Sequence, residues 1–139
     1  MNQSRQLSDI VIVGNFSDDP FAIDLAYAMG QREDIADLIS MKTFANSEFC
    51  PRFISDEHDF SKIGAKLKGK TIVIVSTANG YVSRQNLAMR TMLIARSAKE
   101  NGAEEVILLE PDLFYSAQDR GPHGYLGETQ GERDKEDLK

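Results

Sequence analysis

Three short aliphatic runs stand out in the pattern of apolar and polar positions along the chain. They cover residues 10–13, 71–75 and 106–109, and none of them alternates between apolar and polar side chains. Unbroken aliphatic runs of this length are typical of strands that are covered on both faces, as in a parallel sheet. The pattern therefore predicts three buried parallel strands at these positions.

Two helices with recognisable ends are predicted between these runs. Asp19 and Pro20 suit the N-cap and first position of a helix that ends at Gly30. A longer helix follows Ser83 and ends at Asn101-Gly102. The residues expected on the buried faces share helical spacing: Phe21, Leu25, Ala28 and Met29 in the first helix, and Leu87, Thr91, Ile94, Ala95 and Ala98 in the second.

The segment from residue 38 to residue 54 has a different pattern. Alternating residues precede a polar turn at residues 44–48, and an extended run follows it, which we interpret as two strands with an exposed connection. A further short helix is predicted at residues 60–68. The resulting order, β-α-β-β-α-β-α-β, predicts an α/β parallel-sheet domain in three layers with a small hairpin-like projection.

Composition narrows the class of protein. The chain has 139 residues, 41% of them hydrophobic, which suits one globular domain with its own core. No apolar run approaches the roughly 20 residues that span a bilayer, and the polar N-terminus lacks the apolar segment of a signal peptide. We therefore expect a cytoplasmic protein with no membrane partner. The single cysteine, Cys50, excludes an internal disulfide and is interpreted as a small core residue, not a nucleophile.

The charge distribution argues against a nucleic-acid partner. The net charge is −6, and the chain has no Lys/Arg-rich run of the kind that binds a phosphate backbone.

Residues 121–139 contain few apolar side chains and several glycines, so we expect a polar, disordered tail there. The predicted domain therefore covers residues 1–120.

Ligands of parallel sheets bind at the carboxyl ends of the strands. The loops at those ends include Gly14-Asn15-Phe16 and residues 76–80, which suit ordinary turns as well as a close approach of the backbone to a ligand. No P-loop or Gly-x-Gly-x-x-Gly sequence is present, which excludes the common nucleotide cradles. Asp19 is interpreted as a helix cap and not a phosphoacceptor, and the acidic run at residues 56–59 as a solvated turn and not a metal site.

Two further segments carry side chains suited to a nucleotide. Phe44, Asn46 and Glu48 offer an aromatic face for a purine and polar groups for its exocyclic amine. The Gln-Asp-Arg run at residues 118–120 can reach a phosphate or a metal-bound water. Each segment alone also suits a structural turn.

Together these segments resemble the N-terminal domain of ribose-phosphate pyrophosphokinases, also called phosphoribosyl pyrophosphate synthetases. Val13-Gly14-Asn15 resembles the first-strand Gly-Asn of the family, and Phe44-x-x-x-Glu48 resembles its Phe-Ser-Asp-Gly-Glu turn. Asn86-Leu87 resembles the family's Asn-Leu at the start of a helix, and Tyr115-x-x-Gln118-Asp119-Arg120 resembles its Tyr-Ala-Arg-Gln-Asp-Arg. The resemblance covers about residues 10–120 and implies a fold of the phosphoribosyltransferase-like type.

The resemblance also implies a reaction and an assembly. The family transfers a pyrophosphoryl group from ATP to the C1 hydroxyl of ribose 5-phosphate with Mg²⁺, a step of nucleotide biosynthesis. It completes each ATP site with a turn from a neighbouring subunit, so a homo-oligomer (dimer or hexamer) is expected. By resemblance, the adenine-side residues are Phe44, Asn46, Ser47 and Glu48, and the phosphate-side residues are Ala117, Gln118, Asp119 and Arg120.

Two positions depart from the family pattern. Asn46 stands where the family has Asp, and Ala117 stands where it has Arg, which removes a cation from the triphosphate. Nothing here resembles the family's catalytic lysine-arginine loop, metal-binding histidine or acidic ribose-phosphate loop. We therefore expect an ATP-contributing domain that is inactive by itself, with no catalytic or metal residue of its own. The alternative is a catalytically silent regulatory paralogue that assembles with active subunits.

Overall fold

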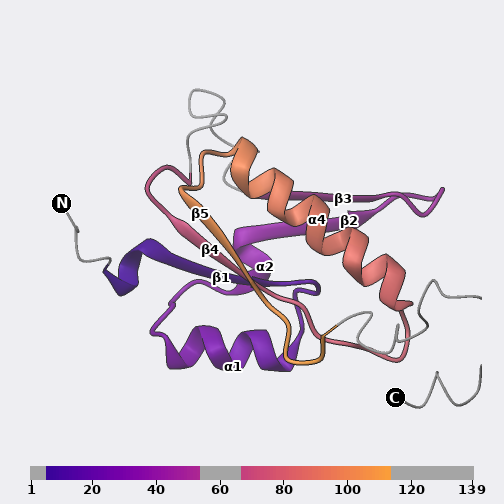
Figure 1. Ribbon diagram of the computed structural model, residues 1–139, viewed down its shortest axis with the longest axis horizontal. Coiled ribbons are helices and arrows are strands. Elements are labelled where there is room, and N and C mark those ends of the chain that lie inside the picture. The colour runs from indigo at the N-terminus through magenta and orange to yellow at the C-terminus, as the bar shows by residue number, and fades with distance from the viewer. Residues whose placement is uncertain (1–5, 54–66, 114–139) are drawn as a thin grey trace, which may run out of the picture.

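The structure is a computed structural model that describes residues 6–53 and 67–113 (Figure 1). The short helix predicted at residues 60–68, the acidic run at 56–59 and the tail lie wholly or largely outside these ranges. In the described ranges no helix is long and apolar enough to cross a bilayer. The elements in chain order are η1 (Leu7–Asp9), β1 (Ile10–Gly14), α1 (Pro20–Ala28), α2 (Ile35–Leu38), β2 (Ile39–Thr43), β3 (Phe49–Phe53), β4 (Thr71–Val75), α4 (Arg84–Glu100) and β5 (Glu105–Leu109).

The three aliphatic runs form a parallel sheet, as predicted. Its strand order is β1-β4-β5, so β4 lies in the centre. Ile10 is paired with Thr71, and Thr71 with Glu105, which aligns the three strands without offset. The aliphatic residues of β1 and β4 form much of the core: Ile12, Val13, Ile72, Ile74 and Val75 are buried.

The segment after α2 forms the predicted hairpin. β2 and β3 pair antiparallel, from Ile39 opposite Phe53 to Thr43 opposite Phe49. Ile39 and Phe53 are fully buried at the base of the hairpin, whereas the turn at its other end is exposed. The hairpin is therefore anchored at its base and projects from the domain (Figure 1).

Helices α1 and α4 cover opposite faces of the sheet (Figure 1). Successive residues of a strand face opposite sides of the sheet, so Gly14 and Asn15 mark its two faces. A Cβ atom on Gly14 would lie 3.0 Å from the Cβ atom of Ala22, which places α1 against the first face. Asn15 contacts Thr91 of α4 on the second face. The fold is an α/β fold with a three-strand parallel sheet, flanking helices and a small antiparallel hairpin.

The predicted start of α1 is confirmed, and the predicted buried face is confirmed in part: Leu25 and Met29 pack against the core, whereas Phe21 and Ala28 are exposed. Asp19 accepts a hydrogen bond from the backbone N–H of Phe21 (3.0 Å), and Pro20 occupies the first helical turn. The buried residues are Ala22 and Ala26, while Phe21 is exposed. Small residues face the sheet because α1 approaches the carboxyl end of β1 too closely for a larger side chain.

The predicted ends and buried face of α4 agree with the structure. The hydroxyl of Ser83 accepts a hydrogen bond from the backbone N–H of Asn86 (3.2 Å), as expected for an N-cap. After α4 the chain turns at Gly102, whose φ of 89° favours glycine. The buried positions of the helix are Leu87, Thr91, Ile94 and Ala98, with Ala95 partly buried beside them.

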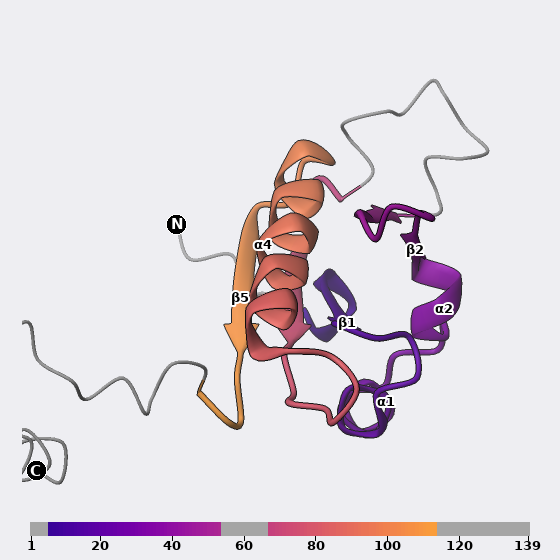
Figure 2. The same cartoon turned by 90° about the vertical axis from the view of Figure 1, so that its right-hand side faces the viewer.

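Strand β5 is less covered than its sequence predicts. Ile107, Leu108 and Leu109 are all exposed, although an unbroken aliphatic run suggested a strand covered on both faces. In the described part of the chain β5 pairs with β4 alone, and Figure 2 shows it at the outer margin of the sheet, away from α1 and α2. The apolar surface of β5 therefore reflects an edge strand, not a central one.

The opposite margin of the sheet is closed by a side chain. The amide of Gln31 accepts a hydrogen bond from the backbone N–H of Ile12 (2.8 Å) and donates one to its carbonyl (3.0 Å). This pair of bonds reproduces those of a neighbouring strand. Gln31 therefore satisfies the edge of β1 at its midpoint, where unpaired backbone groups invite another strand.

A buried polar cluster ties the carboxyl ends of β1 and β4 to α4. Asn15 and Ser76 are fully buried, and the Asn15 amide nitrogen donates to the Ser76 hydroxyl (2.9 Å). The hydroxyl of Thr91 donates to the Asn15 amide oxygen (3.0 Å). Three elements thus meet through the side chain of one asparagine, and each polar group has a partner, as burial requires.

We expect Asn15→Ala to lower the free energy of unfolding by about 2–4 kcal/mol, because it opens a cavity and leaves two buried hydroxyls without their amide partner. Asn86→Ala on the exposed side of α4 is the matched control and should stay within about 0.5 kcal/mol. Urea denaturation followed by circular dichroism measures both. Equal losses for the two variants would contradict the role assigned to Asn15.

Candidate functional site

The predicted adenine-side turn lines a groove of about 700 Å³ between the hairpin and the N-terminal half of α4. Figure 1 shows the hairpin running along α4, with its turn toward the helix N-terminus. The groove also brings in the loop that precedes α4. Its lining residues are Thr43, Phe44, Ser47, Glu48, Phe49 and Cys50 on the hairpin side, and Tyr81, Val82, Ser83, Asn86, Met89, Arg90 and Leu93 on the other.

Backbone hydrogen bonds close the turn at residues 44–48. The N–H of Phe44 donates to the carbonyl of Glu48, and the N–H of Ser47 donates to the carbonyl of Phe44, both at 2.9 Å. Ser47 has a φ of 70°, in the left-handed region that non-glycine residues seldom adopt. The turn is therefore a defined structure that holds Phe44 and Glu48 at adjacent positions.

Asn46 has a structural role within this turn. Its side-chain oxygen accepts a hydrogen bond from the backbone N–H of Glu48 (3.2 Å), which is the local pattern that favours Asn in turns. The amide oxygen predicted to meet a purine amine is thus engaged with the backbone. The carboxylate of Glu48 is exposed and has no bond to another described residue that competes for it.

Phe44 is 43% exposed, and its ring provides an aromatic surface in the lining of the groove. The ammonium group of Lys42 lies 5.1 Å from the centre of this ring. Cations are attracted to aromatic faces, so Lys42 occupies one side of the platform and adds positive charge beside it. A stacked base would use the remaining surface or displace the lysine.

Arg90 is a groove residue that sequence reasoning missed. Its guanidinium lies 5.0 Å from the ring centre of Phe16 and 4.5 Å from that of Phe49, and it donates to the carbonyl of Asn15 (3.3 Å). Partial burial lowers the pKa of Arg90, because desolvation disfavours the charged form. Arg90 is the positively charged member of the described groove lining. The partners of Arg90 are distant from it in sequence, so no local sequence pattern predicts its position in the groove.

The loops that follow β1 and β4 make structural contacts, although the sequence also suggested that they could bind a ligand. Gly14 lies against α1, and Asn15 is buried in the polar cluster. The hydroxyl of Thr77 donates to the Asp19 carboxylate (2.5 Å), and the Asn79 side chain accepts from the N–H of Tyr81 (2.7 Å). These contacts give Gly14, Asn15, Thr77 and Asn79 structural roles.

The remaining predicted site residues divide into three groups. Asn86 lines the groove, whereas its neighbour Leu87 is fully buried and acts in packing. Cys50 is half-buried in the groove wall and not in the core, which corrects the expectation from sequence. The predicted phosphate-side residues lie outside the described ranges: Ala117, Gln118, Asp119 and Arg120.

Within the described ranges, no group of three or more His, Cys, Asp or Glu side chains is arranged to hold a metal ion. Comparison with known proteins adds no assignment, because no protein family, curated protein or solved structure matches the chain. The functional argument therefore rests on the residues of the groove.

We expect Arg90→Ala to lower the free energy of unfolding by about 1–2 kcal/mol, because it removes two ring contacts and a carbonyl bond. Arg96→Ala is the control on the same helix, since Arg96 is exposed and pairs only one turn away with Glu100. It should leave the unfolding midpoint unchanged. Thermal denaturation of both variants measures the difference, and a midpoint for Arg90→Ala equal to that of the parent would count against this packing role.

Proposed function

We propose that this chain is the N-terminal, ATP-contributing domain of a ribose-phosphate pyrophosphokinase, with a sheet of the phosphoribosyltransferase-like type. The proposal is supported above all by the hydrogen-bonded turn that holds an exposed Phe44 beside Glu48. The parent enzyme transfers a pyrophosphoryl group from ATP to the C1 hydroxyl of ribose 5-phosphate. This domain contributes contacts to the nucleotide and not the catalytic group.

The groove chemistry supports binding of the adenine end of ATP. Phe44 offers a ring for stacking, and Glu48 offers an acceptor for the exocyclic amine of the base. Lys42 beside the ring and Arg90 in the groove wall supply positive charge for a polyanionic ligand. A turn that projects from its domain also suits delivery to a site on a neighbouring subunit.

Mg²⁺ enters this proposal as part of the substrate, Mg-ATP. Magnesium is held in proteins by a few carboxylates together with phosphate oxygens and water. By resemblance to the family, we assign the metal ligands to the nucleotide and to other parts of the parent enzyme. The residues of this chain orient the base.

Titration of the 139-residue chain with Mg-ATP tests the proposal. We expect binding toward the millimolar end, about −4 kcal/mol, because the base is held while the triphosphate lacks the cation that Ala117 replaces. Phe44→Ala should weaken binding at least about fivefold, since base–aromatic stacking contributes about 1–3 kcal/mol. Phe21→Ala, an exposed phenylalanine on α1 outside the groove, should bind like the parent.

Calorimetry or amide chemical shifts measure these affinities. Micromolar binding that Phe44→Ala leaves unchanged would place the nucleotide elsewhere. Formation of phosphoribosyl pyrophosphate by the 139-residue chain alone would contradict its assignment as a contributing domain.

We further propose that the chain self-associates, as a dimer or within a hexamer. Exposed apolar side chains on two elements support this: Met89 and Met92 on α4, and Ile107, Leu108 and Leu109 on β5. Sedimentation velocity at increasing protein concentration should show species heavier than the monomer. A single monomeric species up to the highest soluble concentration would contradict the proposal.

The second candidate is a catalytically silent regulatory paralogue that assembles with active subunits. Ala117 favours it, because the family cation at this position is missing. Both candidates use the turn at residues 44–48 in the same way. They differ in whether the parent protein is catalytically active. A parent sequence that retains the acidic ribose-phosphate loop supports the enzyme, and a parent that lacks it supports the paralogue.

A further inference from the structure

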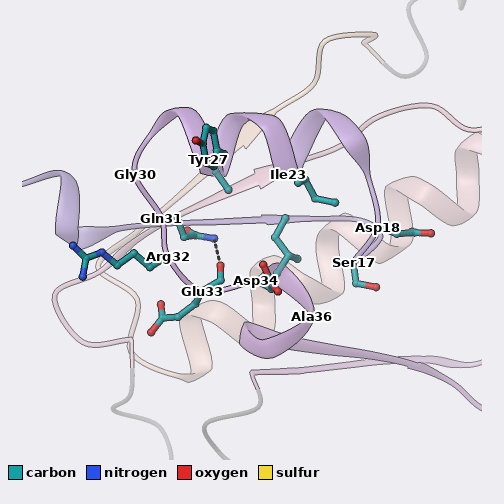
Figure 3. Close-up of a pocket in the computed structure, with 12 residues that line it drawn as sticks. Ser17, Asp18, Ile23, Tyr27, Gly30, Gln31, Arg32, Glu33, Asp34 and Ala36 are labelled. Atoms are coloured by element: carbon teal, nitrogen blue, oxygen red, sulfur yellow. Dashed lines mark hydrogen bonds between the residues drawn. The ribbon is translucent and has the colours of Figure 1, made fainter.

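A second cavity of about 760 Å³ lies between α1 and the segment that leads into α2 (Figure 3). It shares no lining residue with the groove beside α4. Its volume falls within the range of small-molecule sites, about 300–1,000 Å³. Nothing in the proposed function uses it.

Apolar side chains form the floor and one wall of this cavity. Ala26 and Ile35 are buried beneath it, while Ile23 is 45% exposed and Tyr27 84% exposed on α1. Ile23 and Tyr27 are four residues apart, so they lie on the same side of the helix. Large apolar side chains left on a concave surface favour a ligand with an apolar body.

The charged groups of the cavity are mainly acidic. Asp18, Glu33 and Asp34 outnumber Arg32, and Figure 3 shows the Arg32 guanidinium extending away from Asp34. Within the described ranges, none of these four charged side chains forms an ion pair. Asp34 also stands at the N-cap of α2, but its carboxylate makes no capping hydrogen bond.

We propose that this cavity binds a small organic cation: a primary ammonium group on an aromatic or branched aliphatic body. Asp34 pairs with the ammonium group, and Ile23 and Tyr27 cover the apolar body. The ring of Tyr27 adds attraction for the same cation. Excess negative charge disfavours phosphates and carboxylates here, so the ligand differs from the nucleotide of the proposed function.

The hydrogen bonds of Gln31 favour a small molecule over an extended peptide. A peptide that bound as an added strand would need the free backbone groups of β1. Gln31, which lines the cavity, already bonds both backbone groups of Ile12. Recognition in this cavity therefore comes from carboxylates and apolar surface and not from the sheet edge.

The test is a titration of the ¹⁵N-labelled 139-residue chain with phenethylammonium chloride, followed by amide chemical shifts. We expect a roughly millimolar dissociation constant, with shifts centred on α1 and residues 31–36. 3-Phenylpropionate, which has the same body and the opposite charge, should leave these amides unshifted. Asp34→Asn should weaken the ammonium ligand about two- to fivefold, the size expected for one exposed ion pair.

Two control variants separate this site from general effects of charge and exposure. Asp37→Asn changes the same charge on the same helix outside the cavity and should bind like the parent. Tyr27→Ala should weaken binding, whereas Tyr81→Ala, which removes another exposed tyrosine in the other groove, should not. Equal shifts with the carboxylate probe, equal effects of Asp34→Asn and Asp37→Asn, or no shift at these amides would overturn the proposal.

Discussion

The hydrogen bonds of one buried side chain, Asn15, hold the described fold together. Asn15 follows β1 directly, and its amide joins Ser76 at the end of β4 to Thr91 in the middle of α4. Its own carbonyl accepts from Arg90, whose guanidinium lies between two rings of the groove. The position of α4 over the sheet and the wall of the groove therefore depend on the same residue. An apolar residue there would pack, but it would not set the rotation of the helix.

Much of the fold could be predicted from the sequence where the signal is local. The N-caps at Asp19 and Ser83 are read from single residues because a cap needs only its own helix. The buried face of α1 could be predicted only in part, at Leu25 and Met29. Its orientation is set by the close approach of Ala22 to Gly14, and spacing alone favoured the larger Phe21. Helix α2 spans only four residues, which is too short for a periodic pattern.

The candidate site shows the same limit. A turn of five consecutive residues could be predicted at Phe44, Asn46, Ser47 and Glu48, because its hydrogen bonds run within the segment. The opposite wall of the groove comes from α4, about forty residues later, and no local pattern connects the two. Arg90 illustrates the difficulty. From sequence alone, an arginine in a helix is predicted to be a solvated surface charge, and only the structure shows its aromatic neighbours. Conversely, the sequence at Gly14 and Asn15 suggested a ligand-binding loop, but in the structure both residues act in packing.

The two hydrogen bonds of the Gln31 amide satisfy the edge of β1 at its midpoint, whereas the edge of β5 at the other margin of the sheet is left open by the other described strands. A filament built by strand pairing needs two free edges on every molecule, because each copy must receive one neighbour and be received by another. Here the midpoint of β1 is already occupied, so of the two edge strands of the three-strand sheet β5 is the one whose edge is not bonded by Gln31. Pairing of β5 with β5 of a second copy about a two-fold axis would use the open edge of the three-strand sheet in both chains. A single glutamine thus leaves the two edges of the three-strand sheet unequal as places for another strand to pair.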